Sequence, residues 1–147
     1  MNLPDYVPAD EVKRVCRELK IRDWSTLTRA EVLPEEAQII LSAIDTGSLK
    51  VNPDDFRQGL EVELEHGTRY PDANVTNNHP ILTGKIVLAH LKESLDYYRR
   101  LDIAELEGDL LKALIKKDLP ELARLHKKLA EARLVLCQTE AAQLSKA

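Results

Sequence analysis

The sequence is short of glycine, cysteine and aromatic residues, and each shortage narrows the kinds of protein it can encode. Only five glycines occur among 147 residues, whereas 31% of the residues are charged, which is typical of a helical protein. The two cysteines, Cys16 and Cys137, form neither a Cys-x-x-Cys motif nor a disulfide framework, so we expect reduced thiols packed as small core hydrophobes. With one Trp, one Phe and four Tyr, the core must be built mainly from aliphatic side chains.

The sequence also lacks an excess of basic residues and any long apolar run. Its formal net charge is −4, and nucleic-acid binding draws on clustered lysines and arginines, so we expect no nucleic-acid partner. No segment approaches the roughly 20 apolar residues of a membrane-spanning helix. Residues 1–11 are acidic and have no apolar segment of the kind found in secretion signals. We therefore expect a cytoplasmic protein with no membrane partner.

Apolar residues recur at helical spacing along most of the chain, and no strand pattern interrupts them. The clearest helix start is Asn52 followed by Pro53, an N-cap residue and a first-turn proline. This start predicts a helix over 52–67. A second long helix is predicted over 80–101, with a polar loop between the two. The fold class is therefore all-α.

The remaining pattern predicts a compact bundle of about six helices in a single domain, 1–147. Residues 1–101 form its helical core, and residues 102–147 form a C-terminal helical hairpin. The last helix repeats apolar residues in alternating steps of three and four, at Leu122, Leu125, Leu129, Ala132 and Leu136. Packing against the other helix of the hairpin explains this stripe. The alternative is a homodimer or a protein partner that docks through residues 102–147.

One charged residue interrupts the apolar stripe of the helix predicted at 52–67. Helical spacing places five residues on one face: Phe56, Gly59, Leu60, Glu63 and Leu64. An ionised carboxylate in such a stripe is costly unless it is paired, hydrogen-bonded or bound to a metal. His66 follows Glu63 by three residues, at the edge of the same face. Glu63 is therefore the residue that departs most clearly from a plain helical domain.

Glu63, His66 and His90 are the candidate metal ligands of the chain. Glu-x-x-His spacing presents two ligands together in di-metal carboxylate bundles. Two imidazoles and a carboxylate suit zinc with an open position, or the facial triad of non-haem iron. The divalent metals considered are zinc, iron and manganese. Tyr97, two turns beyond His90 on the predicted helix, is a candidate to orient a bound group.

Other interpretations of these residues remain open. Glu63 could pair with a lysine or arginine of a neighbouring helix, and His90 could be a core histidine with one hydrogen bond. His66 could interact with the C-terminal end of its own helix, where a cation is favoured. A proton-transfer or small-ligand site without metal is a further alternative. No substrate or reaction follows from the sequence, and whether the protein is an enzyme stays open.

The loop between the two long helices contains oxygen-bearing residues at alternating positions: Asp72, Asn74, Thr76 and Asn78. This spacing begins like the calcium loop of an EF-hand. Thr83 stands at the twelfth position, however, where a bidentate glutamate is required. Turn and cap chemistry explains the loop better, and His79 before Pro80 is expected to lie at a helix cap.

Three blocks of sequence occur in a fixed order. The first is Gly-Leu-x-x-Glu-x-Glu-His-Gly at 59–67, and the second is Asn-Val-Thr-Asn at 74–77. The third is Thr-Gly-Lys-Ile-x-Leu-Ala-His-Leu-Lys-Glu at 83–93, closed by Asp-Tyr-Tyr at 96–98. In order and spacing, the region Gly59–Leu101 resembles an uncharacterised bacterial family, domain of unknown function 5661.

The resemblance implies a helix–loop–helix unit and brings no known activity with it. It places Glu63, His66 and His90 inside the matching blocks. One departure is Asn78-His79, where we expect the family to have paired aspartates before the proline. This departure weakens the case for a metal site in the loop of this chain.

Overall fold

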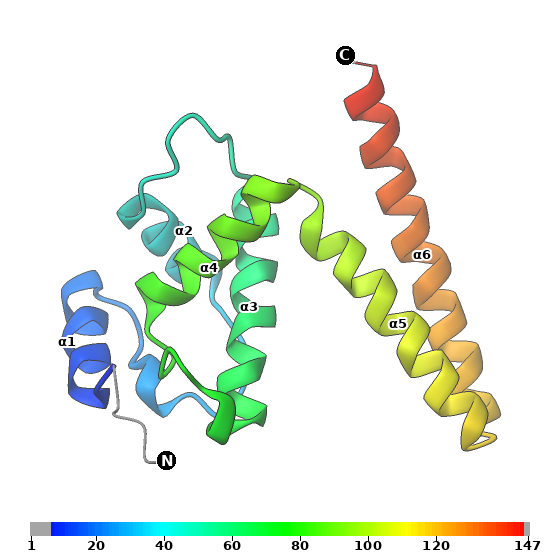
Figure 1. Cartoon of the computed structure of the whole chain (residues 1–147), viewed down its shortest axis with the longest axis horizontal. Helices are drawn as coiled ribbons and strands as arrows, with labels where there is room; N and C mark the ends of the chain where they lie inside the picture. Colours follow the sequence, from blue (N-terminus) through cyan, green and yellow to red (C-terminus); the bar gives the residue numbers. More distant parts are fainter. Residues whose placement is uncertain (1–6, 146–147) are drawn as a thin grey trace. The chain divides into compact units, whose positions relative to one another are not determined.

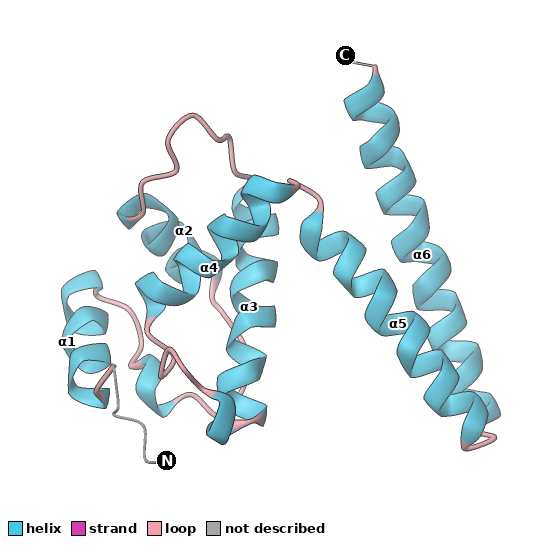
Figure 2. Cartoon of the chain, in the orientation of Figure 1, coloured by secondary structure: helices cyan, strands magenta, loops and turns pink. Residues whose placement is uncertain are grey.

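The computed structural model describes residues 7–145, so the first six residues of the acidic N-terminal segment lie outside it. Within residues 7–145 the chain forms six α-helices and two 3₁₀ turns and has no strand, which confirms the expected all-α class (Figure 2). The elements are α1 (Ala9–Leu19), η1 (Trp24–Thr26), α2 (Pro34–Ala43), α3 (Pro53–Arg69), η2 (Pro71–Ala73), α4 (Pro80–Glu93), α5 (Tyr97–Ile115) and α6 (Leu119–Leu144).

The chain divides between Leu95 and Asp96 into two compact units. The first unit contains α1 to α4, and in it α3 packs against both α2 and α4 (Figure 1). The second unit is the hairpin of α5 and α6. That the two units form a single domain stays a prediction. None of the helices in residues 7–145 combines the length and the apolar composition that crossing a membrane requires.

The core of the first unit is built from the apolar stripes of its helices. Phe56, Leu60 and Leu64 of α3 are buried, as their spacing predicts. Trp24 is fully buried and anchors the connector between α1 and α2. Gly84 lets α4 approach α2 closely, because a Cβ at this position would lie 2.4 Å from a side-chain carbon of Ile44. The small residue thereby brings α4 into the core.

Local cap chemistry fixes where α3 and α4 begin. The side chain of Asn52 accepts hydrogen bonds from the backbone N–H groups of Asp54 (2.8 Å) and Asp55 (3.2 Å), and Pro53 opens the helix. The Nδ1 atom of His79 accepts from the backbone N–H of Leu82 at 3.3 Å. His79 is therefore a cap residue, as expected. These two caps set the register of the helices that carry Glu63 and His90.

The single helix predicted over 80–101 is wrong, because the structure has two helices there. α4 ends at Glu93, Ser94 is extended (φ −157°, ψ 131°), and α5 begins at Tyr97. The carboxylate of Asp96 accepts two hydrogen bonds from the Arg100 guanidinium, at 3.0 and 2.8 Å. This pair joins residues four apart at the start of α5, so it stabilises the new helix rather than ending α4. The apolar spacing continues across the break, so periodicity alone does not reveal it.

The second unit is the predicted hairpin, although α5 begins five residues before the expected boundary at Asp102. Ala113 of α5 and Leu125 and Leu129 of α6 are buried, so the predicted stripe of α6 faces α5. Cys16 is buried as expected, but Cys137 is exposed, and its placement on the core stripe was wrong. Cys137 follows Leu136 of the stripe by one residue, which turns it about 100° away.

Candidate functional site

Glu63 lies where the sequence predicts it, within the buried stripe of α3. Its side chain is only 10% exposed, and Leu60 and Leu64 beside it in the helix are fully buried. Removing a carboxylate from water to this degree requires polar partners. The question for the site is therefore which groups of the first unit face this carboxylate.

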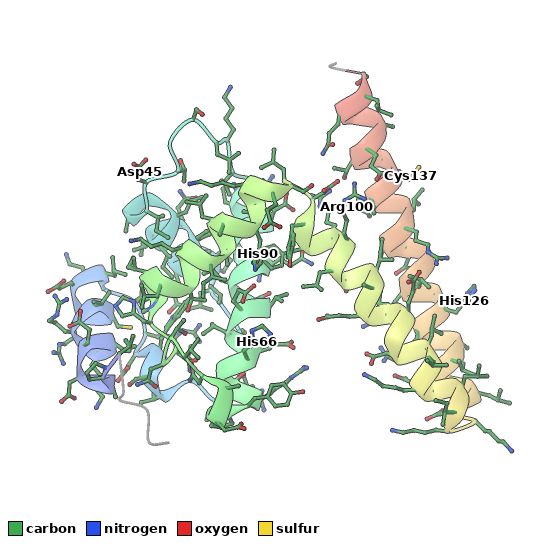
Figure 3. All side chains as sticks on the ribbon, in the orientation of Figure 1. Asp45, His66, His90, Arg100, His126 and Cys137 are labelled. Atoms are coloured by element: carbon green, nitrogen blue, oxygen red, sulfur yellow. The ribbon has the colours of Figure 1, made fainter. Side chains whose placement is uncertain are left out.

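The structure brings His66 and His90 to opposite oxygens of the Glu63 carboxylate. The Nδ1 atom of His66 lies 3.5 Å from Oε2, and the Nε2 atom of His90 lies 3.6 Å from Oε1. Figure 3 labels both histidines, one on α3 and the other on α4. His66 is 64% exposed and His90 is 30% exposed. The three predicted ligands are thus neighbours, although they come from two helices separated by a loop.

Tyr97, the fourth predicted site residue, lies on a different helix from the one predicted. The prediction placed it two turns beyond His90 on one continuous helix. Because the helix breaks after Glu93, Tyr97 opens α5 in the second unit, and helical register no longer links it to His90. Its ring packs edge-on against Tyr98, with ring centroids 5.2 Å apart. A role for Tyr97 beside Glu63 stays a prediction.

The distances around Glu63 are close to those within a metal site. With bonds of about 2.0–2.1 Å, two ligands of a tetrahedral zinc lie about 3.3 Å apart. The two oxygen–nitrogen distances exceed this value by only a few tenths of an ångström. The histidines face different oxygens, however, and residues 7–145 contain no preformed group of three or more His, Cys, Asp or Glu side chains arranged to hold a metal. A shared metal would therefore require a side chain to turn, and exposed His66 has room to do so.

A cavity of about 120 Å³ opens beside Glu63 and His66. By the volume of liquid water, this space corresponds to about four molecules. Thr83 of α4 lines it and is only 2% exposed, and within the described part of the chain its hydroxyl oxygen has no hydrogen-bond partner. A buried hydroxyl left without a partner costs about 1–3 kcal/mol. The cavity therefore offers space next to the carboxylate.

The asparagine-rich loop forms one wall of this cavity. The Asn74 amide donates to Oδ1 of Asn78 at 3.1 Å, while the Asn78 backbone N–H lies 3.3 Å from Oδ1 of Asn74, which accepts from it. Gly67 of α3 must lack a side chain here, because a Cβ would lie 1.9 Å from Asn78 Oδ1. Asn77 and Asn78 adopt positive φ angles of 50° and 59°, which asparagine tolerates better than most residues. These bonds are turn chemistry, the interpretation preferred over calcium.

Sequence reasoning missed a second buried carboxylate in the same unit, Glu36. This residue is 3% exposed and accepts two hydrogen bonds from the Arg22 guanidinium, at 2.9 and 2.7 Å. Burial alone would raise the pKa of Glu36, but the bonds from Arg22 and from the Leu33 backbone N–H hold the pKa below its ordinary value. This pair has a structural role, because it ties the connector after α1 to the start of α2.

The comparison with protein families matches one family over residues 12–107, well over half of the chain. Its description is "Protein of unknown function (DUF5661)". The chain belongs to this family. The family match confirms the resemblance recognised over Gly59–Leu101, extends it from α1 into α5, and includes Glu63, His66 and His90. Neither the curated proteins nor the solved structures contain a match to the chain.

Proposed function

We propose that the first unit binds one divalent metal ion through Glu63, His66 and His90. The observation that supports this proposal is the shielded Glu63 carboxylate with an imidazole nitrogen 3.5–3.6 Å from each oxygen. A metal would replace two long contacts between the carboxylate and the imidazoles with short bonds. Zinc, iron and manganese all accept this donor set.

The cavity beside Glu63 and His66 extends the proposal. A catalytic metal site needs an open position next to its protein ligands, and the space lined by Glu63, His66 and Thr83 provides one. The proposed function is metal binding, and we assign no reaction to it.

Metal content tests the proposal directly. The protein is purified without a histidine tag, loaded with zinc, dialysed and subjected to elemental analysis. We expect about one zinc per chain in the wild type and, because a ligand is lost, more than about 100-fold weaker binding in His90→Ala. His126→Ala is the matched control, since His126 is an exposed histidine of the hairpin. A wild type without metal, or a His90→Ala variant that keeps it, would overturn the proposal.

A second candidate function is association through the hairpin. Most of the large apolar side chains that stand exposed in residues 7–145 belong to α5 or to α6. They are Leu111, Leu114, Ile115, Leu119, Leu134, Val135 and Leu144. Exposed apolar surface of this kind is typical of interaction sites. Sedimentation equilibrium of the full chain tests this candidate, and a monomer at every concentration would contradict it.

A further inference from the structure

The outer face of α6 carries a second apolar stripe that the hairpin does not cover. The stripe facing α5 contains Leu125 and Leu129. About half a turn around the helix, exposed residues recur in strictly alternating steps of three and four. We call these the outer seam: Lys127, Ala130, Leu134, Cys137, Ala141 and Leu144. Figure 3 shows Cys137 and His126 on the side of α6 that points away from α5.

The spacing of the outer seam is that of a helix that packs against another helix. Alternating steps of three and four keep one seam facing a partner over several turns. Small residues at Ala130 and Ala141 allow close approach, and Leu134 and Leu144 supply apolar area, being 59% and 77% exposed. The single charge in the seam, Lys127, lies at its end, where a long side chain can reach solvent.

We propose that the outer seam binds a second copy of this chain, with the two α6 helices antiparallel. This inference rests on the second candidate function and names its partner. We choose a second copy because the outer seam is self-complementary. Antiparallel pairing places Leu134 opposite Cys137, Ala130 opposite Ala141 and Lys127 opposite Leu144. Each large side chain then meets a smaller or flexible one, and each contact occurs twice about the two-fold axis.

Charge complementarity favours the antiparallel orientation. Arg133 and Glu140 flank the seam on the same side, two turns apart, and antiparallel pairing brings each Arg133 to Glu140 of the second copy. Both already form ion pairs inside the hairpin, Arg133 with Glu107 at 2.6 Å and Glu140 with Arg100 at 2.8 Å. The new contacts would join these pairs into one network. A parallel pair would instead place Arg133 beside the neutral Gln138.

Two glutamate substitutions test which surface is used. Leu134 of the seam and Leu111 of α5 are both 59% exposed, so Leu134→Glu and Leu111→Glu add the same charge at equal exposure within one hairpin. Sedimentation equilibrium should show a dimer for the wild type and for Leu111→Glu, and a monomer for Leu134→Glu. Dissociation by Leu111→Glu alone would keep hairpin association but refute the seam. A monomeric wild type would refute both.

Spin labels test the orientation. Cys137 is the exposed cysteine, whereas Cys16 is buried and burial raises the pKa of its thiol, so labelling selects Cys137. Because Cys137 lies inside the seam, it is replaced by alanine, and the label is placed at the exposed position next to the end of the seam, in His126→Cys with Cys137→Ala. In the antiparallel dimer these labels should lie about 30 Å apart, because 19 residues separate them along the axis at 1.5 Å each. A short distance between them would establish a parallel pair and overturn the proposal.

Discussion

At the scale of single residues, Glu63 and Glu36 show two ways in which a helix tolerates a buried carboxylate. Glu36 is satisfied by a guanidinium and backbone N–H groups within normal hydrogen-bond distances. The two histidines beside Glu63 lie at longer distances, 3.5 and 3.6 Å. The first arrangement is a closed structural pair. The second places two imidazole nitrogens beside one carboxylate, and this geometry is the basis of the proposed metal site.

A first prediction concerns Gly67, which the asparagine loop requires. A Cβ in Gly67→Ala would collide with Asn78 Oδ1 and disrupt the Asn74–Asn78 hydrogen bond, at a cost of about 2 kcal/mol. Gly108→Ala is the control, because no atom lies within 4 Å of its Cβ and alanine favours a helix by about 1 kcal/mol. In urea denaturation, the midpoint should be lower than that of the wild type for Gly67→Ala and higher for Gly108→Ala. Equal shifts would contradict the packing described for Gly67.

Glu36 gives a prediction about pH. Because its folded-state pKa is depressed, the pair with Arg22 contributes stability above the ordinary glutamate pKa, and this stability is lost as the pH falls through the folded value. Glu36→Gln should cost about 2 kcal/mol at neutral pH and much less in acid. The measurement is the urea midpoint of the wild type and of Glu36→Gln at several pH values between about pH 3 and pH 7. A gap between them that does not narrow in acid would refute this account.

Part of the site could be predicted because helical spacing fixes directions within one element. Placing Glu63 in the stripe and His66 beside it required only the period of α3. The approach of His90 to Glu63 is harder to predict, since it depends on how α4 packs against α3. The resemblance to the family helped here, because its blocks include both helices. The Arg22–Glu36 pair and the hydroxyl of Thr83 were missed, because no local pattern marks a partner fourteen residues away or a cavity.

At the scale of elements, caps and breaks decide the fold more than periodicity does. The starts of α3 and α4 follow the proline and cap signals that the sequence displays. The break at Ser94 carries no proline or glycine, so the predicted helix over 80–101 continued through it. The break also affects the candidate site, because Tyr97 belongs to α5 and not to the helix that carries His90. Serine and aspartate are weak signals of a helix end, since the same residues also occur inside helices.

The cap of α3 supports a prediction at this scale. Asn52→Ala removes the acceptor of two backbone N–H groups and should cost about 1 kcal/mol. Asn52→Asp keeps an acceptor and adds a charge favoured at a helix N-terminus, so it should be neutral or slightly stabilising. Thermal unfolding of both variants provides the test. If alanine and aspartate destabilised equally, the cap would not be the reason that α3 begins at Pro53.

At the scale of the whole molecule, the two proposals use separate parts of the chain. The proposed metal site lies in the first unit, within the family match over residues 12–107, whereas the outer seam lies on α6 beyond that match. The proposals share no residue. We therefore expect Leu134→Glu to keep one zinc per chain and Glu63→Gln to remain dimeric. Elemental analysis and sedimentation of both variants test this independence, and loss of both properties in either variant would contradict it.

Calorimetric titration of zinc into the metal-free protein tests the central claim most directly. The wild type should bind one zinc per chain. Glu63→Gln should lose this binding, while Glu65→Gln should keep it, since Glu65 is paired with Arg69 at 2.8 Å on the same helix. A wild type that takes up no zinc, or a Glu63→Gln variant that binds as tightly as Glu65→Gln, would show that the Glu63 carboxylate holds no metal.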